Sequence, residues 1–164
     1  MATINDPDLA KFLDLIAFSE GTSTSHITQA DGYDVIVSGV DGPSIFTDYT
    51  DHPFAQGGAV TVRRAPLLVS TAAGRYQVLA RYWNAYKAQL RLPDFSPASQ
   101  DAVALQQMKE RKAVEMVEAD NVEGAVAACS NIWASFPGNT YGQGGESMAA
   151  LLAKYAELAA VASA

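Results

Sequence analysis

The apolar side chains near the N-terminus repeat with the period of an α-helix. Asp6-Pro7-Asp8 is a typical helix start, because the first aspartate can cap backbone N–H groups and proline suits the first turn. Gly21 favours the left-handed conformation that ends a helix, so we predict a helix that ends near Glu20. Its apolar positions recur at intervals of three or four and share one face: Leu9, Phe12, Leu13, Ile16 and Ala17.

After Gly32 the pattern changes to that of strands. The runs 33–37 and 45–49 are rich in β-branched and aromatic residues, and they flank the turn-forming segment 39–43 with its glycines and proline. We predict a small β-hairpin here. Residues 52–74 contain further prolines and glycines without a sustained period, which favours a long loop or a short strand.

Helical spacing resumes after Gly74 and continues to the C-terminus. Leu79, Tyr82, Trp83 and Tyr86 lie at helical intervals, and Ser96-Pro97 predicts another helix start. Further helices are expected at about 112–119, 122–134 and 146–161. The chain therefore reads as one helix-rich α+β domain, residues 1–164, with a small β element in its N-terminal third.

Charge and cysteine content narrow the classes of function. The 164 residues include 18 acidic and 11 basic side chains, a net charge of −7, so no basic stripe is available to bind nucleic acid. The single cysteine, Cys129, cannot form an internal disulfide and is expected as a buried small apolar residue. The N-terminus shows neither a signal peptide nor a membrane span, so we expect synthesis in a cytoplasm and no membrane insertion.

Metal and cofactor chemistry has no motif in this sequence. His26, His52 and Cys129 are too scattered for a metal-ligand spacing, and neither a Ser-His-Asp order nor a glycine-rich phosphate loop is evident. We predict no metal and no cofactor.

Six local strings, in order, carry more specific information, and together they resemble the lambda phage endolysin family over nearly the whole chain. The stretch from Phe54 to Val62 does not align with this family, and the segment Gly144-Gly145-Glu146 also differs from it. The strings are Phe18–Gly21; Gly32–Val37; Phe46–Tyr49 with Asp51–Pro53; Gly74–Gln77; Phe95–Pro97 with Ser99–Gln107; and Ser130–Ser135 with Pro137-Gly138 and Tyr141–Gln143.

The resemblance implies a lysozyme-like fold whose substrate cleft is lined by the β hairpin. It also implies non-hydrolytic cleavage of the β-1,4 bond between N-acetylmuramic acid and N-acetylglucosamine in peptidoglycan, leaving a 1,6-anhydro end. The family's catalytic acid corresponds to Glu20, and its strings that match Tyr76-Gln77 and Tyr141–Gln143 lie near the cleft. We expect a monomer that waits in the host cytoplasm until a holin permeabilises the membrane, then reaches the periplasm and wall.

The residues themselves are compatible with this chemistry. A glycosidic oxygen leaves only when protonated, so the enzyme needs a carboxylic acid with a raised pKa. Glu20 at a helix C-terminus faces the negative end of the helix dipole, and Ile16, Ala17 and Phe18 can desolvate it, both of which raise a carboxyl pKa. The carboxylate formed can then take the proton of the muramic acid C6 hydroxyl, which attacks the anomeric carbon.

The polar and aromatic residues are also compatible with other functions. Asp34 or Asp48 would be the second carboxylate of a hydrolytic muramidase, and a non-catalytic glycan-binding domain is a third possibility. Substrate contacts are expected from residues whose rings, amides, carboxylate or hydroxyl suit sugars. These residues are Tyr33, Asp34, Ser70, Tyr76, Gln77, Tyr141 and Gln143.

Overall fold

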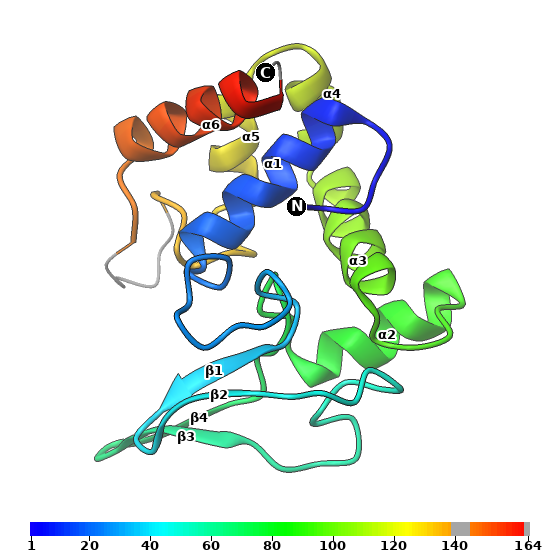
Figure 1. Cartoon of the computed structure of the whole chain (residues 1–164), viewed down its shortest axis with the longest axis vertical. Coiled ribbons are helices and arrows are strands. Elements are labelled where there is room, and N and C mark those ends of the chain that lie inside the picture. The colour runs from blue at the N-terminus through cyan, green and yellow to red at the C-terminus, as the bar shows by residue number, and fades with distance from the viewer. Residues whose placement is uncertain (139–144, 163–164) are drawn as a thin grey trace. The chain divides into compact units, whose positions relative to one another are not determined.

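The computed structural model describes residues 1–138 and 145–162. The chain divides into two compact units, one of Met1–Glu20 with Ala104–Ala164 and one of Gly21–Val103. The boundary between them falls inside one helix, α3 (Pro97–Glu110). Figure 1 labels the helices and strands along the chain.

The first unit is helical and is built around α1 (Pro7–Ser19). Helix α1 packs against α4 (Ala113–Glu118) and α6 (Met148–Ala162), and α5 (Val122–Cys129) packs against α4 and α6. Figure 1 shows α1 in blue and α6 in orange and red, and these two helices contact each other. The core of this unit includes the fully buried Phe12, Ile16, Phe136 and Leu151. The predicted apolar stripe is therefore confirmed as the buried face of α1.

The N-terminus of α1 has the predicted cap. The Asp6 side chain accepts hydrogen bonds from the backbone N–H groups of Asp8 (3.0 Å) and Leu9 (3.1 Å), and Pro7 occupies the first turn. Such a cap stabilises a helix by about 1 kcal/mol. At the other end, Glu20 is the C-cap and Gly21 has φ +71°, so the predicted helix stop is confirmed.

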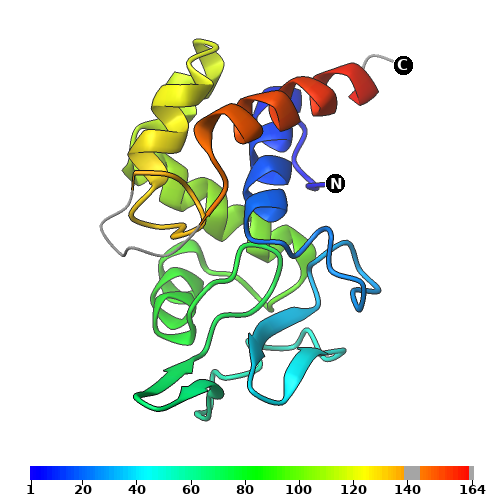
Figure 2. The ribbon, with the colours of Figure 1, turned by 90° about the vertical axis from the view of Figure 1, so that its left-hand side faces the viewer.

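The second unit contains two antiparallel hairpins. Strand β1 (Val35–Gly39) pairs with β2 (Gly42–Ile45), and β3 (Val60–Arg64) pairs with β4 (Leu67–Ser70). The Val40 N–H donates to the Thr61 carbonyl (2.9 Å), which links the end of the first hairpin to β3. Figure 2 shows β1 and β2 in cyan and β3 and β4 in green.

The first hairpin was predicted, but its second strand is earlier and shorter than expected. Val35 pairs with Ile45, and the following Phe46 still donates its N–H to the Asp34 carbonyl (2.9 Å). The Phe46 ring then enters the core against Phe95, with ring centroids 5.8 Å apart. Strand pairing ends there because the chain turns inward to bury this ring.

The second hairpin corrects the expectation of a long loop or a single short strand over residues 52–74. Glycines and prolines are frequent in that range, and they favour loops. The β-prone residues of 60–62 and 67–69 nevertheless pair, with Val60 opposite Ser70 and Arg64 opposite Leu67. Runs of only five and four residues, with glycines and prolines nearby, give little signal of a hairpin in the sequence.

An aromatic cluster forms much of the interior of the second unit. Helix α2 (Ala80–Leu90) contributes the fully buried Trp83, whose ring lies edge-on to Phe95 at 4.8 Å. Its indole N–H donates to Asp51 (2.7 Å), and the His52 ring lies 4.8 Å from Phe95. Trp83 is therefore a packing residue of this unit.

The remaining helices were predicted with approximate ends. The helix expected over 122–134 stops at Cys129, after which Ile132 and Trp133 donate their N–H groups to the Cys129 carbonyl in tight turns (2.9 and 3.1 Å). The Asn121 side chain caps the start of α5 through the Gly124 N–H (3.0 Å). Across the described ranges, no helix combines the length and the apolar character needed to cross a bilayer.

Candidate active site

Glu20 sits at the position where the last turn of α1 ends. Its backbone N–H donates to the Ile16 carbonyl (2.9 Å), so the residue is still tied to the helix. Helix α1 is buried along Leu13, Ile16 and Ala17. The acid is therefore carried on a rigid element, and its carboxyl is partly buried.

The side chain of Ser135 forms a hydrogen bond with the carboxyl group of Glu20. Its hydroxyl donates to Glu20 Oε1 at 2.6 Å, a contact between residues 115 positions apart in the chain. Ser135 stands between Trp133 and Phe136, which are buried and lie edge-on to each other at 6.0 Å. Phe136 in turn packs on Phe12 of α1 at 6.2 Å. The helix that carries the acid thus also anchors the turn that carries its partner.

The pKa of Glu20 is raised above its ordinary value, as expected for a general acid. Burial of the carboxyl is the main cause, and hydrogen bonds from the Ser135 hydroxyl and backbone act in the opposite direction. Within the described residues no charged side chain contributes to this shift. The predicted direction is confirmed, with desolvation as its cause.

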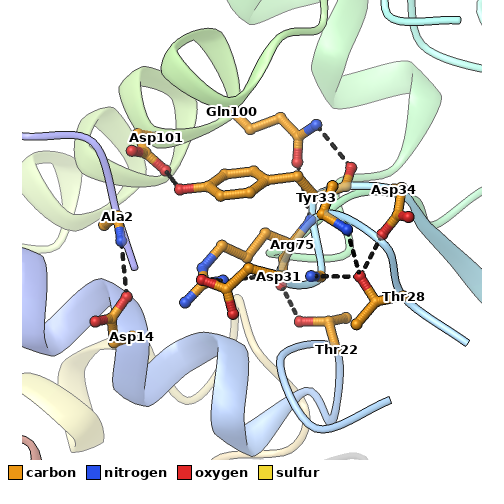
Figure 3. Close-up of polar contacts among 12 residues, drawn as sticks. Ala2, Asp14, Thr22, Thr28, Asp31, Tyr33, Asp34, Arg75, Gln100 and Asp101 are labelled. Carbon is orange, nitrogen blue, oxygen red and sulfur yellow. Dashed lines mark hydrogen bonds and ion pairs between the residues drawn. The ribbon is translucent and has the colours of Figure 1, made fainter. Parts of the chain in front are cut away.

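Asp34, a candidate second carboxylate, is buried in a loop of the second unit. One oxygen accepts from the Thr28 hydroxyl and the other from the Gln29 N–H (2.8 Å). Thr28 itself accepts the Gly32 N–H (2.7 Å), so these groups close the loop 28–34 (Figure 3). Both oxygens of Asp34 are thus used within its own loop.

Asp48, the other candidate, lies in an exposed turn. Its carboxylate accepts the Thr50 N–H (2.9 Å), and hydrogen bonds from Thr50 lower its pKa. A lowered pKa favours the carboxylate form. This environment is the one expected of a turn-capping aspartate.

Tyr33 and Tyr76 are both buried in the interior of the second unit. Their hydroxyls donate to the same oxygen of Asp101, at 2.8 and 2.6 Å, and their rings meet edge-on at 6.3 Å. Figure 3 shows the Tyr33 ring directed at Asp101. Burial raises the pKa of each hydroxyl. Neither ring presents an exposed face, so the structure brings the two tyrosines together as an internal pair.

The segment that carries Tyr76 is held by Gln100. The Gln100 side chain accepts the Arg75 N–H (2.8 Å) and donates to the carbonyls of Tyr33 (3.0 Å) and Phe95 (2.9 Å). Arg75 forms an ion pair with Asp31 (2.9 Å) (Figure 3). These contacts order the segment that leads to Gln77.

The other predicted substrate contacts fall into two groups. Gln77 is partly buried, has φ +50°, and donates its amide to the Gly74 carbonyl (3.0 Å); the Ser70 hydroxyl accepts the Ala72 N–H (3.2 Å). Tyr141 and Gln143 lie outside the described residues. The sugar-binding assignments stay predictions.

Ser135, the partner of Glu20, and Asp101, the partner of Tyr33 and Tyr76, were not predicted from the sequence. Both belong to strings that carried the family resemblance, yet neither has a local pattern that reveals its partner. Asp101 itself could have indicated an internal polar contact. It lies on a helix close to Val103 and Ala104, which are buried, and an acid in such surroundings needs a polar partner.

Over residues 1–138 and 145–162, no group of three His, Cys, Asp or Glu side chains is arranged to hold a metal ion. Cys129 is fully buried, and burial raises the pKa of its thiol to about 12. A thiol in that state is a poor nucleophile.

The helix-rich fold with two hairpins, and an acid of raised pKa at a helix end, define a lysozyme-like α+β protein. Bacteriophage lambda lysozyme complexed with a chitohexasaccharide matches with a TM-score of 0.85 and 50% identity, covering 97% of each chain. A second structure of the lambda lysozyme matches with a TM-score of 0.75 and 46% identity, over 98% of this chain and 94% of that one. The predicted fold class is confirmed.

Sequence comparison gives the family. A family model described as Endolysin matches residues 10–162. The endolysin of Escherichia phage P2 is 53% identical over 137 residues, 83% of both chains, and that of Escherichia phage lambda is 51% identical over 158 residues, 96% of this chain and 94% of the relative. The chain belongs to the endolysin family, the phage enzymes that degrade the bacterial cell wall.

Proposed function

We propose that this endolysin is a lytic transglycosylase and that Glu20 is its catalytic acid and base. The observation that carries the proposal is the carboxyl of Glu20, which is partly buried, has a raised pKa, and is hydrogen-bonded to the neutral Ser135 hydroxyl. The lambda lysozyme structure holding a chitohexasaccharide supports a glycan strand of peptidoglycan as the substrate.

The reaction needs one carboxyl and no water. Protonated Glu20 gives its proton to the glycosidic oxygen as the bond to the anomeric carbon of N-acetylmuramic acid breaks. The C6 hydroxyl of the same sugar then forms the new bond to that carbon, and its proton passes to the Glu20 carboxylate. The acid is regenerated, and the products are a 1,6-anhydro end and a free 4-hydroxyl on N-acetylglucosamine.

An internal nucleophile makes a second carboxylate unnecessary. A well-oriented intramolecular attack can lower the barrier by about 7–11 kcal/mol relative to a bimolecular one. The contacts of Asp34 and Asp48 are consistent with a mechanism that uses a single carboxylate, because each of these aspartates accepts hydrogen bonds from its own turn.

The decisive experiment is digestion of purified peptidoglycan in water enriched in oxygen-18, followed by mass spectrometry of the fragments. We expect 1,6-anhydro ends without the heavy isotope. Reducing ends that carry oxygen-18 would show hydrolysis, and the protein would then be a muramidase of the Asp34 or Asp48 type.

Glu20→Gln tests the role of the acid. The amide keeps the size of the side chain but cannot donate a proton to the leaving oxygen, so we expect a loss of about 100-fold or more in kcat. Glu118→Gln, an exposed change of the same chemistry, is the matched control and should keep the parental rate. Parental activity in Glu20→Gln would remove this residue from the mechanism, and glycan binding without cleavage by the parent would indicate a non-catalytic binding domain.

We further propose that the protein acts as a monomer after a holin opens the membrane to it. Support comes from its membership of the endolysin family. Expression in a bacterial host with and without a membrane-permeabilising protein tests this dependence, with lysis expected only when both are present.

A further inference from the structure

We propose that Ser135, locked in place by the backbone of Gly145 and Glu146, is a positioning residue that determines which oxygen of Glu20 carries the catalytic proton. The inference deepens the proposed function and rests on it. It concerns three residues that the sequence reading did not assign to the site. Their geometry lies within the helical unit.

The first step is the direction of the hydrogen bond. A serine hydroxyl has one proton, and at 2.6 Å from Glu20 Oε1 it donates that proton to a carboxyl oxygen. When Glu20 is protonated, Oε1 therefore serves as the acceptor and Oε2 is the oxygen that carries the acid proton. Among the described residues this side-chain bond occupies Oε1, so we assign delivery of the proton to the other oxygen, Oε2.

The second step is the restraint on Ser135. Its carbonyl accepts the Glu146 N–H at 3.1 Å. A Cβ placed on Gly145 would lie 2.2 Å from the Ser135 carbonyl oxygen and 2.8 Å from its carbonyl carbon. Both are backbone atoms, so they cannot move aside as a flexible side chain would. The absence of a side chain at residue 145 is what allows this close approach.

The third step links the same turn to the helix of the acid. Phe136 follows Ser135 directly, is fully buried, and packs against Phe12 of α1. Ser135 is thus held from two sides, by the 145–146 backbone and by the core beneath α1. A hydroxyl restrained in this way orients the carboxyl to which it donates, with little loss of rotamer entropy when the substrate binds.

The protonation of Glu20 supports the same role. The Ser135 hydrogen bonds lower the pKa of Glu20 while burial raises it. Removal of the hydroxyl takes away a donor to the charged form, so the pKa must rise further. Hydrogen bonds to charged groups are strong enough to move a pKa by about one unit or more.

The test measures kcat and KM against pH for Ser135→Ala, Ser135→Thr and a control, Ser147→Ala. The Ser147 hydroxyl caps α6 by accepting the Ala150 N–H (3.1 Å), so its loss removes a nearby hydroxyl that serves the helix rather than the acid. For Ser135→Ala we expect kcat to fall about 10- to 100-fold at unchanged KM, since misplacing a catalytic group costs rate. The descending alkaline limb of kcat/KM should move up by about one pH unit.

Ser135→Thr keeps a hydroxyl at the same position and should restore most of kcat and the parental pH profile. Gly145→Ala should reproduce the Ser135→Ala effects, because the added methyl displaces the Ser135 backbone. A Ser135→Ala profile that is unchanged, or that moves to lower pH, would overturn the proposal. Equal losses in Ser135→Ala and Ser147→Ala would do the same.

A second measurement keeps the failure of this proposal separate from the failure of the proposed function. Carbon-13 NMR titration of the Glu20 carboxyl reads its pKa without any substrate. A higher pKa in Ser135→Ala than in the parent is expected, and an equal or lower one refutes the hydrogen-bond argument. If Glu20→Gln keeps full activity, the assignment of the catalytic acid fails whatever the titration shows.

Discussion

Replacing Gly74 by alanine should destabilise the second unit far more than the same change at Gly42. Both glycines have a positive φ, +79° at Gly74 and +93° at Gly42, where a side chain is strained. An added Cβ at Gly42 meets no atom within 4 Å, whereas at Gly74 it would lie 2.3 Å from Gln100 Oε1 and 3.0 Å from the Phe95 ring. The pair therefore separates backbone strain from steric overlap.

The expected magnitude follows from what must move. The left-handed backbone alone costs about 1–2 kcal/mol, which is the expected loss for Gly42→Ala. At Gly74 the buried Gln100 must also shift, which breaks its bond to the Arg75 N–H and overpacks the core. An unsatisfied buried amide costs about 1–3 kcal/mol and overpacking about as much again. Added to the backbone strain of about 1–2 kcal/mol, these give an expected loss of about 3–8 kcal/mol for Gly74→Ala.

Urea denaturation is the assay. The chain has two tryptophans, Trp83 in the second unit and Trp133 in the first, so a Trp133→Phe background reports the second unit alone. With a slope of about 2 kcal/mol per molar urea, Gly74→Ala should lower the midpoint by about 1.5–4 M. Equal midpoints for the two alanine variants would refute the reasoning, because the contact with Gln100 would then have no energetic weight.

Three further outcomes follow from buried groups. Burial lowers the pKa of His52, whose Nδ1 accepts the Phe54 N–H. The contribution of neutral His52 to stability is therefore complete above the unfolded pKa near 6.5 and is lost as the pH falls below that value. Thermal melts from pH 8 to 5 should show this decline in stability, and His52→Gln should make the pH dependence flatter. Tyr76→Phe should cost about 1.5–3 kcal/mol in urea, because a buried bond to the Asp101 carboxylate is lost. Cys129, with a pKa of about 12, should react with a thiol reagent at pH 8 only as fast as the protein unfolds, so rapid labelling of the native protein would contradict its burial.

The parts of the fold that the sequence predicted are those with local signals. Helix α1 has a capping acid, an apolar stripe and a glycine stop within 16 residues, Asp6 to Gly21, and all three features are present in the structure. Glu20 could be placed at a helix end for the same reason. The direction of its pKa shift also followed from local neighbours, because burial of α1 near its C-terminus desolvates the acid.

The parts that were missed depend on contacts between distant residues. Ser135 meets Glu20 across 115 positions, and Asp101 meets Tyr33 across 68, separations at which no periodicity operates. The sugar contacts predicted for Tyr33 and Tyr76 stay predictions, because an aromatic ring and a hydroxyl suit either a sugar or an internal partner. Only the tertiary structure shows that one buried carboxylate receives both hydroxyls.

The nature of the partner at Glu20 bears on how one residue can serve as acid and then as base. An arginine beside the carboxyl would favour the anion and lower the pKa by about 1–3 units, while a second carboxylate would strongly favour the protonated form. A serine hydroxyl is neutral, so it can donate to Oε1 in both protonation states, and it lowers the pKa of Glu20 without placing a charge beside the carboxyl. Burial acts in the opposite direction and raises the pKa of Glu20 above its ordinary value, which favours the protonated acid. In the proposed reaction the same oxygen, Oε2, can thus give a proton to the leaving oxygen and take one back from the C6 hydroxyl without reorienting the carboxyl.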